Sequence, residues 1–452
     1  MESKTRKTFI QLSPVQQFVA SFLLLIFAGT LLLKTPCATV NGISFINALF
    51  TSTSAVCVTG LAVLDTGKDF TFAGQVIIIA LIQLGGLGFM TFTIGIFSML
   101  GGSFSLKWRF AFSEIYNEVT IIPPTQILKK IIFYTIIIES ITSFILFTQF
   151  IKKLSLADSI WFSVFHSISA FCNAGFSTFS DSLMPFNNNP VVIITISFSI
   201  ILGGIGFIVL TELANLKIRR KNPVFRQFSL HSKLVLVSTI ALIISGGLLF
   251  LFLEWSHVLK NFSLTEKILT AYFQSVTCRT AGFNSIDTGS LRHSTLSIMM
   301  LLMFIGGSPG SIAGGIKTTT FAVISGMVIS KFRGKKQVVF WDRSINEDII
   351  NKSMTLVILS FIFIYASTIT ILSVHSFDEN NSFLQVMFEV ISAFATVGLS
   401  TGITPRFPDL SKFLLTIVMF VGRVGPFAIL TAISVKQKDI EIEIADENIM
   451  IG

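Results

Sequence analysis

Long apolar runs alternate with short polar stretches along the whole chain. Several of these runs reach the roughly 20 residues that an α-helix needs to cross the hydrocarbon core of a bilayer. The eight runs lie near residues 15–33, 73–100, 129–151, 190–216, 230–253, 294–330, 351–373 and 411–436. This pattern predicts an integral membrane protein with eight transmembrane helices.

A shorter amphipathic stretch lies between the two runs of each successive pair and leads into a glycine among small or polar residues. The stretches cover residues 43–56, 157–171, 265–277 and 382–394, and the glycines are Gly60, Gly175, Gly282 and Gly398. Each unit is therefore expected to form a helix, a half-membrane pore helix with its loop, and a second helix. Four units predict an all-α membrane protein around a pseudo-fourfold pore. Their expected boundaries are 1–103, 104–217, 218–337 and 338–452, the last with a cytoplasmic tail.

Composition and charge agree with a membrane location. Hydrophobic residues make up 52% of the chain and charged residues 13%, against about 25% charged residues in soluble domains. Of the 33 Lys and Arg residues, 21 lie in five segments that the positive-inside rule places in the cytoplasm. These segments are the N-terminus, residues 104–130, 217–233, 331–352 and the tail after residue 435. Both termini are therefore expected in the cytoplasm and the glycine loops outside, and no nucleic-acid partner is expected from the basic residues.

The first apolar run has two interpretations. Lys4, Arg6 and Lys7 precede it, as in a secretory signal peptide. Its length and the lack of a convincing small-residue cleavage site favour a retained membrane span.

Enzymatic chemistry finds little support in the sequence. The five histidines are scattered and the four cysteines are isolated. Cys57, Cys172 and Cys278 lie three or four residues before a repeated glycine, which favours a place in the packed shell of the loops over a disulfide or metal site. The segment 310–318 differs from a phosphate-binding loop because Ile316 separates the glycine from the lysine and no strand precedes it. We therefore expect neither an enzyme nor an organic cofactor.

Glycine loops at membrane depth suit a cation pathway. Irregular backbone is tolerated there only where protein or a water-filled cavity satisfies it. Carbonyls that line an axis can replace the water around a cation, and glycine reaches the backbone angles that turn successive carbonyls the same way. The alternative is close helix packing at small residues. Four loops in register with the apolar runs favour the pore.

These loops resemble the Trk/Ktr/HKT superfamily of potassium transporters, and most closely the Ktr membrane subunit, over the whole chain. The resemblance implies that potassium is bound by the backbone of Gly60, Gly175, Gly282 and Gly398. It implies that neighbouring filter backbone comes from Val58, Thr59, Asn173, Ala174, Thr280, Ala281, Thr396 and Val397. In plant relatives a serine at the first filter glycine accompanies sodium preference, so Gly60 favours potassium.

A second glycine repeat follows each filter glycine by 24 to 28 residues. Its copies are Leu84–Phe89, Leu202–Phe207, Ile305–Gly310 and Val421–Pro426. They are expected to ring the pore below the filter, where close packing against the filter loops is sufficient to explain the first two.

The third copy lies in an overlong apolar run. Residues 294–330 would form a helix of about 55 Å, nearly twice the ~30 Å hydrocarbon core, so the helix must bend or break. The residues that would break it are Gly306, Gly307, Ser308, Pro309, Gly310, Gly314 and Gly315. Lys317 favours a wet cavity over lipid. The resemblance implies an intramembrane gating loop at 306–317, and a plain helix kink is the alternative.

The fourth copy carries Arg423 where the other copies have glycine. A mid-membrane arginine costs at least about 2.5 to 3.5 kcal/mol, so it should face the pore or a carboxylate. The resemblance implies an electrostatic barrier that acts with the gating loop. The alternative is a buried ion pair with an acidic residue, and Glu139 and Glu389 are the other obvious charges at membrane depth.

The expected function is potassium uptake across the plasma membrane, with sodium dependence left open. No Gly-x-Gly-x-x-Gly follows a strand, so nucleotide sensing is not intrinsic to the chain. The resemblance implies a homodimer, which the tail 436–452 could support, and a separate cytosolic ring that binds ATP or ADP and docks on 217–233, 331–352 and the tail. The alternatives are a sodium or non-selective cation transporter of the same fold, or a secondary carrier for another solute, although same-orientation units argue against inverted repeats.

Overall fold

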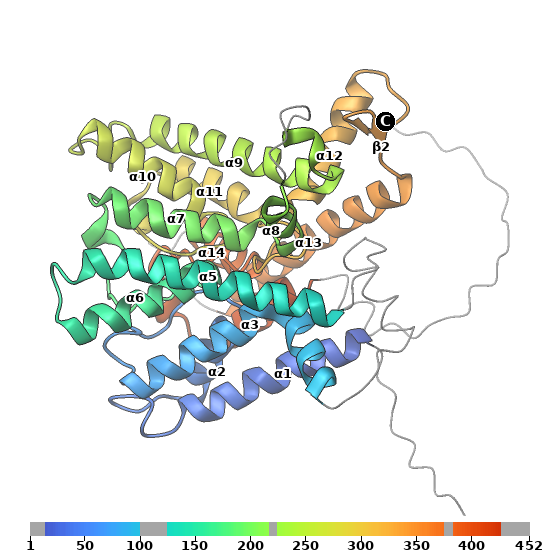
Figure 1. Cartoon of the computed structure of the whole chain (residues 1–452). Coiled ribbons are helices and arrows are strands. Elements are labelled where there is room, and N and C mark those ends of the chain that lie inside the picture. Colours follow the sequence, from blue (N-terminus) through green and yellow to red (C-terminus); the bar gives the residue numbers. More distant parts are fainter. Residues whose placement is uncertain (1–13, 100–123, 217–223, 375–382, 426–452) are drawn as a thin grey trace, which may run out of the picture.

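The computed structural model describes residues 14–99, 124–216, 224–374 and 383–425, which are mostly helical (Figure 1). The α-helices are α1 (Pro14–Leu33), α2 (Phe45–Val56), α3 (Phe72–Met99), α5 (Pro124–Phe150), α6 (Leu156–Phe171), α7 (Pro190–Gly204), α8 (Phe207–Ala214), α9 (Leu230–Glu254), α10 (Leu264–Thr277), α11 (His293–Phe304), α12 (Thr318–Phe332), α13 (Glu347–Val374), α14 (Phe383–Phe394) and α15 (Asp409–Val424). Short 3-10 turns lie at η1 (Met184–Phe186), η2 (Val224–Gln227), η3 (Thr288–Ser290) and η4 (Thr404–Arg406).

A small hairpin corrects the expectation of a purely helical chain. Strands β1 (Val339–Phe340) and β2 (Arg343–Ser344) pair antiparallel between α12 and α13. The Phe340 ring packs against Gly326 of α12, which ties the hairpin to that helix. A two-residue strand carries too little alternation for sequence periodicity to reveal it.

The long apolar runs differ in how continuous their helices are. Within the described residues, α5, α9 and α13 are long and apolar enough to cross a membrane, and α7 with α8 forms a pair bent by 105° that passes the test together. The runs 73–100 and 190–216, each expected to form one transmembrane helix, are interrupted at a glycine. Gly88 and Gly206 have φ of 73° and 92°, a left-handed conformation open to glycine that interrupts a right-handed helix. The predicted break in 294–330 is confirmed, because α11 ends at Phe304 and α12 begins at Thr318.

Four short helices occupy the amphipathic stretches, within two residues of the predicted bounds: α2, α6, α10 and α14. Three of them begin after a serine, namely Ser44, Ser155 and Ser263, whose hydroxyl accepts the backbone N–H three residues later at 3.2 to 3.3 Å. Such an N-cap satisfies a donor that the helix itself leaves unpaired. Local sequence therefore sets where these helices start.

The short helices begin at the surface, where Leu156 of α6 and Leu264 of α10 are each 62% exposed. Each short helix packs against neighbouring helices: α2 against α1, α3 and α15, α6 against α5 and α7, α10 against α7 and α9, and α14 against α11, α13 and α15 (Figure 1). The last turns of the short helices are buried, whereas Phe144 of α5 and Phe252 of α9 are 70% and 81% exposed. Large apolar side chains on an outer face are what a lipid-facing surface requires.

Several sequence predictions lie outside the described residues. These are the cytoplasmic placement of both termini, the dimer role of the tail 436–452, and docking on residues 217–223. The first apolar run is described. It packs into the fold as α1, where the Ile26 carbonyl accepts a hydrogen bond of 2.7 Å from Ser52 Oγ of α2.

Candidate ion-coordination site

The four glycine loops share an unusual backbone. The residue two positions before each glycine has a left-handed φ of 51° to 67°: Val58, Asn173, Thr280 and Thr396. The glycines themselves have φ of 67° to 92°, and the residue between lies outside the left-handed region. A left-handed conformation at a non-glycine residue costs on the order of 1 to 3 kcal/mol and tends to occur at functional sites. Alternating hand along three residues turns successive carbonyls toward the same side.

The four loops meet in a closed ring, which we call the glycine ring (Gly60, Gly175, Gly282 and Gly398). A Cβ added to Gly60 would lie 3.2 Å from the Cα of Gly175, and one added to Gly175 would lie 2.9 Å from the Cα of Gly282. A Cβ added to Gly282 would lie 3.2 Å from the Cα of Gly398, and one added to Gly398 would lie 2.9 Å from the Cα of Gly60. The ring leaves no room for a side chain.

Carbonyls belong to the same ring. The residue before each glycine presents its carbonyl oxygen to the glycine of the adjacent loop: Thr59 to Gly398, Ala174 to Gly60, Ala281 to Gly175, and Val397 to Gly282. The hydroxyl oxygens of Thr59 and Thr396 are buried and have no hydrogen-bond partner among the described residues. Oxygen atoms without donors around one axis suit a cation.

A hydroxyl at the end of each short helix clamps its loop, and sequence reasoning missed it. Ser54 Oγ accepts the Gly60 N–H at 3.0 Å and donates to the Leu61 carbonyl at 2.7 Å. In the other loops one of the two bonds is present: Ser169 and Thr277 donate to the carbonyls of Phe176 and Phe283 at 2.7 Å, and Ser392 accepts the Gly398 N–H at 3.1 Å. A signal was present, since a serine stands six residues before three of the four glycines and a threonine five before the other.

Ser54→Ala is expected to loosen the ring. It leaves the partly buried Gly60 N–H without its acceptor, a penalty of up to about 1 to 3 kcal/mol. We expect discrimination of potassium against sodium, measured by competitive uptake, to fall severalfold, and Ser54→Thr to retain it. Ser52→Ala is the matched control, because Ser52 lies on the same helix but donates to Ile26 of α1 at 2.7 Å. Equal loss of discrimination in both alanine variants would contradict the clamp.

The second glycine repeat packs against the ends of the short helices, as the close-packing interpretation predicts. A Cβ on Gly85, Gly203 or Gly422 would overlap a carbonyl at the end of the short helix of the same unit, at Val56, Phe171 or Phe394. These glycines allow close approach of α3, α7 and α15. The third copy differs, because Gly306 packs on Gly314 within its own loop.

Residues 306–317 form a closed loop, the 306–317 segment. Gly306 N donates to the Ile316 carbonyl at 2.9 Å, and Ile316 N donates to the Phe304 carbonyl at 3.1 Å. A Cβ on Gly314 would lie 3.0 Å from the Ala395 carbonyl, beside Thr396 of the fourth loop. The segment therefore contacts the end of α14 directly beside the glycine ring.

The segment is also bonded to the break between α7 and α8. Ser308 N donates to the Gly204 carbonyl at 2.9 Å, and Phe207 N donates to the Gly310 carbonyl at 3.1 Å. Lys317 Nζ donates to the Ala313 carbonyl at 2.7 Å within the segment. Backbone hydrogen bonds thus attach the segment to α7 and α8.

Arg423 joins the segment to α3. Its guanidinium donates to the carbonyls of Ile312 and Gly85, the latter at 2.6 Å. In the described part of the chain, ion pairs are formed by Lys68 with Asp65 and by His257 with Glu254, not by Arg423. The carboxylate of Glu389 instead accepts from Ser400, Thr401 and Thr404. The ion-pair alternative therefore lacks support.

Sequence reasoning also missed a buried arginine in the third loop. Arg279 is 7% exposed and lies three residues before Gly282, where the first two loops have Cys57 and Cys172. These two cysteines and Cys278 are buried free thiols, as the packed-shell interpretation predicts.

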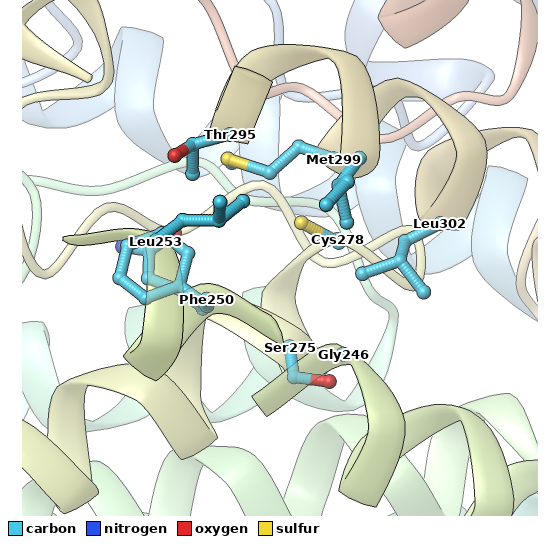
Figure 2. Close-up of a pocket in the computed structure, with 10 residues that line it drawn as sticks. Gly246, Phe250, Leu253, Ser275, Cys278, Thr295, Met299 and Leu302 are labelled. Carbon is cyan, nitrogen blue, oxygen red and sulfur yellow. The ribbon is translucent and has the colours of Figure 1, made fainter. Parts of the chain in front are cut away.

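A small cavity of about 10 Å³ lies next to the third loop, beside Cys278 (Figure 2). Side chains from α9, α10 and α11 converge on it, including Phe250, Cys278, Met299 and Leu302. Gln274, Ser275 and Thr295 also line it, but the space holds no more than about one water molecule, so we assign no ligand site to it.

Comparison with known proteins agrees with these observations. The TrkH family model, described as a cation transport protein, matches residues 3–442. Ktr system potassium uptake protein B of Bacillus subtilis is 41% identical over 450 residues, 98% of each chain. Potassium/sodium uptake protein NtpJ of Enterococcus hirae is 36% identical over 457 residues, 100% of this chain and 99% of that one. The crystal structure of the potassium transporter TrkH from Vibrio parahaemolyticus has a TM-score of 0.74 at 17% identity, and covers 95% of this chain and 87% of that chain.

Fold and family model together define a multi-pass membrane protein of the cation-transport class. The chain belongs to the TrkH/Ktr family, as its membrane subunit. The resemblance predicted from the glycine loops is confirmed. The roles of the individual residues remain predictions.

Proposed function

We propose that this protein takes up potassium across the plasma membrane, through a filter formed at the glycine ring. The closed contact of Gly60, Gly175, Gly282 and Gly398 is the observation that carries this proposal. Relatives named as potassium uptake proteins support the choice of ion.

The proposed filter works by replacing water with carbonyl oxygens. Backbone from the predicted filter residues would coordinate the ion: Val58, Thr59, Asn173, Ala174, Thr280, Ala281, Thr396 and Val397, beside the four glycines. The short helices α2, α6, α10 and α14 end at these loops, and each helix C-terminus carries about half a negative charge. Both effects lower the energy of a dehydrated cation on the axis. No step requires an organic cofactor.

We assign the 306–317 segment as the gate. It lies beside the ring, spans the break between α11 and α12, and is fastened by a few backbone hydrogen bonds and by the buried side chains of Ile312 and Ile316. Such an attachment can be released without unfolding a helix. A cytosolic nucleotide-binding subunit would act on this gate from the cytoplasmic side, with the chain as a homodimer and both termini in the cytoplasm.

Arg423→Gln is expected to speed transport by up to about two orders of magnitude. At an effective dielectric constant of about 20, a unit charge ~6 Å from a permeating cation raises its energy by roughly 3 kcal/mol. The substitution also weakens the bonds to Ile312 and Gly85 that hold the segment. The maximal rate of potassium uptake and the yield of folded protein are measured together. A slow, poorly folded variant would contradict the barrier and revive the ion-pair interpretation.

A sodium-linked mode is the second candidate. A relative covered almost end to end is named as a potassium/sodium uptake protein. Uptake by a potassium-transport-deficient strain carrying this chain tests both candidates. We expect this strain to grow at low potassium and to take up potassium. The rate of potassium uptake is then measured with and without external sodium. Sodium uptake without potassium uptake would overturn the first candidate.

A further inference from the structure

Arg279 of the third loop has few partners for a buried charge. Its Nη2 donates to Thr239 Oγ1 of α9 at 3.3 Å, and its Nε is buried without an acceptor among the described residues. The described ion pairs do not include it. A guanidinium carries five N–H donors and keeps its charge in proteins. Most of its capacity for hydrogen bonds is therefore unused in this arrangement.

Arg279 borders a small cavity of about 10 Å³, room for about one water molecule, that also touches the 306–317 segment at Gly307. The remaining wall consists of Ile200, Ile201, Gly204, Ile243, Val276 and Gly307. The aliphatic side chains offer no hydrogen-bond acceptor. Gly204 and Gly307 have no side chain, so they contribute only backbone to the wall. Gly204 ends α7, and Gly307 belongs to the segment.

The Gly204 carbonyl is held by the segment in this arrangement. It accepts the Ser308 N–H at 2.9 Å, while the adjacent Gly203 carbonyl accepts the Ile312 N–H at 3.4 Å. Withdrawal of the segment would leave both carbonyls without these donors. A buried carbonyl without a donor is unfavourable, so a substitute donor would stabilise the released arrangement.

We propose that Arg279 is the positioning residue that supplies this substitute. As the segment withdraws, the side chain turns from Thr239 across the cavity and donates to the Gly204 carbonyl. The proposal rests on the assignment of the segment as a gate. Arg279 then stabilises the open arrangement. It can shift the balance between the two states because it forms this hydrogen bond only in the open one.

The two buried arginines thus bias the gate in opposite directions. Arg423 already donates to the Ile312 carbonyl and to Gly85, which favours the arrangement described here. Arg279 lies at the cavity beside Gly307 of the segment, and its Nε has no acceptor among the described residues. The same chemistry, a guanidinium with backbone carbonyls, serves both states.

Arg279→Gln tests the proposal in two backgrounds: the full chain, and a chain shortened by removal of residues 308–315. In the full chain we expect the maximal rate of potassium uptake to fall by about tenfold, as loss of open-state stabilisation requires, with the KM and the potassium-to-sodium ratio unchanged. Arg279→Lys should restore part of the rate because it keeps the charge and some donors. In the shortened chain the glutamine substitution should change the rate less than about twofold, because there is no segment left to release.

Thr239→Val is the matched control for a structural role. It removes the bond that holds Arg279 at rest. The proposal predicts a rate equal to or above that of the parent, whereas a role in supporting the third loop predicts a loss like that of Arg279→Gln. If the glutamine variant fails to fold, the lysine and valine variants decide the question.

Three results would overturn the role of Arg279. They are an unchanged rate in Arg279→Gln, an equal loss in both backgrounds, or a slow Thr239→Val variant. The gate assignment is tested separately, by the potassium uptake rate of the shortened chain with Arg279 intact. If the shortened chain takes up potassium no faster than the parent, the gate assignment is wrong, and the proposal for Arg279 fails with it.

Discussion

Gly282→Ser is expected to lower the discrimination of potassium against sodium by about tenfold or more, which corresponds to about 1.4 kcal/mol or more of relative binding free energy. A side chain at this position would contact the Val397 carbonyl and approach the Cα atoms of Gly175 and Gly398 at 3.2 Å each. It would also have to adopt a φ of 77°. Crowding and reoriented carbonyls should raise the apparent KM for potassium or admit sodium.

A second glycine separates crowding in the ring from general backbone strain. Gly402 has a φ of 89°, but no atom lies within 4 Å of a Cβ added there. Gly402→Ser should therefore lower stability without changing selectivity. Competitive uptake of radioactive rubidium against potassium and sodium measures both variants and the serine variants at Gly60, Gly175 and Gly398. If all four ring variants match the parent, the filter assignment is wrong.

Removal of residues 308–315 is expected to raise potassium flux about tenfold or more when the cytosolic partner is absent. The deletion removes the Ser308 and Ile312 donors to α7 and the Ile312 carbonyl that Arg423 holds. Gly306 and Gly307 remain to join α11 to α12. Flux should then depend little on the partner, because the part that the partner moves is gone.

The double variant sharpens this prediction. Because Arg423 acts partly through Ile312, adding Arg423→Gln to the deletion should increase flux by less than it does in the full chain. Ser311→Ala is the control, since it removes one hydroxyl, bonded to the Ser308 carbonyl at 2.6 Å, and leaves the backbone bonds in place. Unchanged or lower flux from a correctly folded deletion variant would reject the gate.

Local sequence signals were sufficient for the helices of the fold. Apolar length predicted the long spans, the amphipathic stretches predicted α2, α6, α10 and α14, and the overlong run required a break before Thr318. These features depend on a few neighbouring residues, so a single sequence contains them. The kinks at Gly88 and Gly206 were missed because a glycine inside an apolar run fits a packed helix equally well.

The backbone of the site lay beyond sequence reasoning. Val58, Thr280 and Thr396 are β-branched, and local preference argues against the left-handed φ that they adopt. That conformation is imposed by contacts in the closed ring, which is formed by loops more than 100 residues apart in the chain. Local rules fail where tertiary contacts store strain for function.

Ion selectivity of the purified protein tests the central claim most directly. Protein reconstituted in liposomes, without any other subunit, is assayed for uptake of radioactive rubidium in competition with potassium and with sodium. The proposed filter predicts that potassium competes at a much lower concentration than sodium, and that Gly282→Ser narrows the difference while Gly402→Ser leaves it intact. Equal competition by the two ions in the parent protein would contradict a potassium filter at the glycine ring.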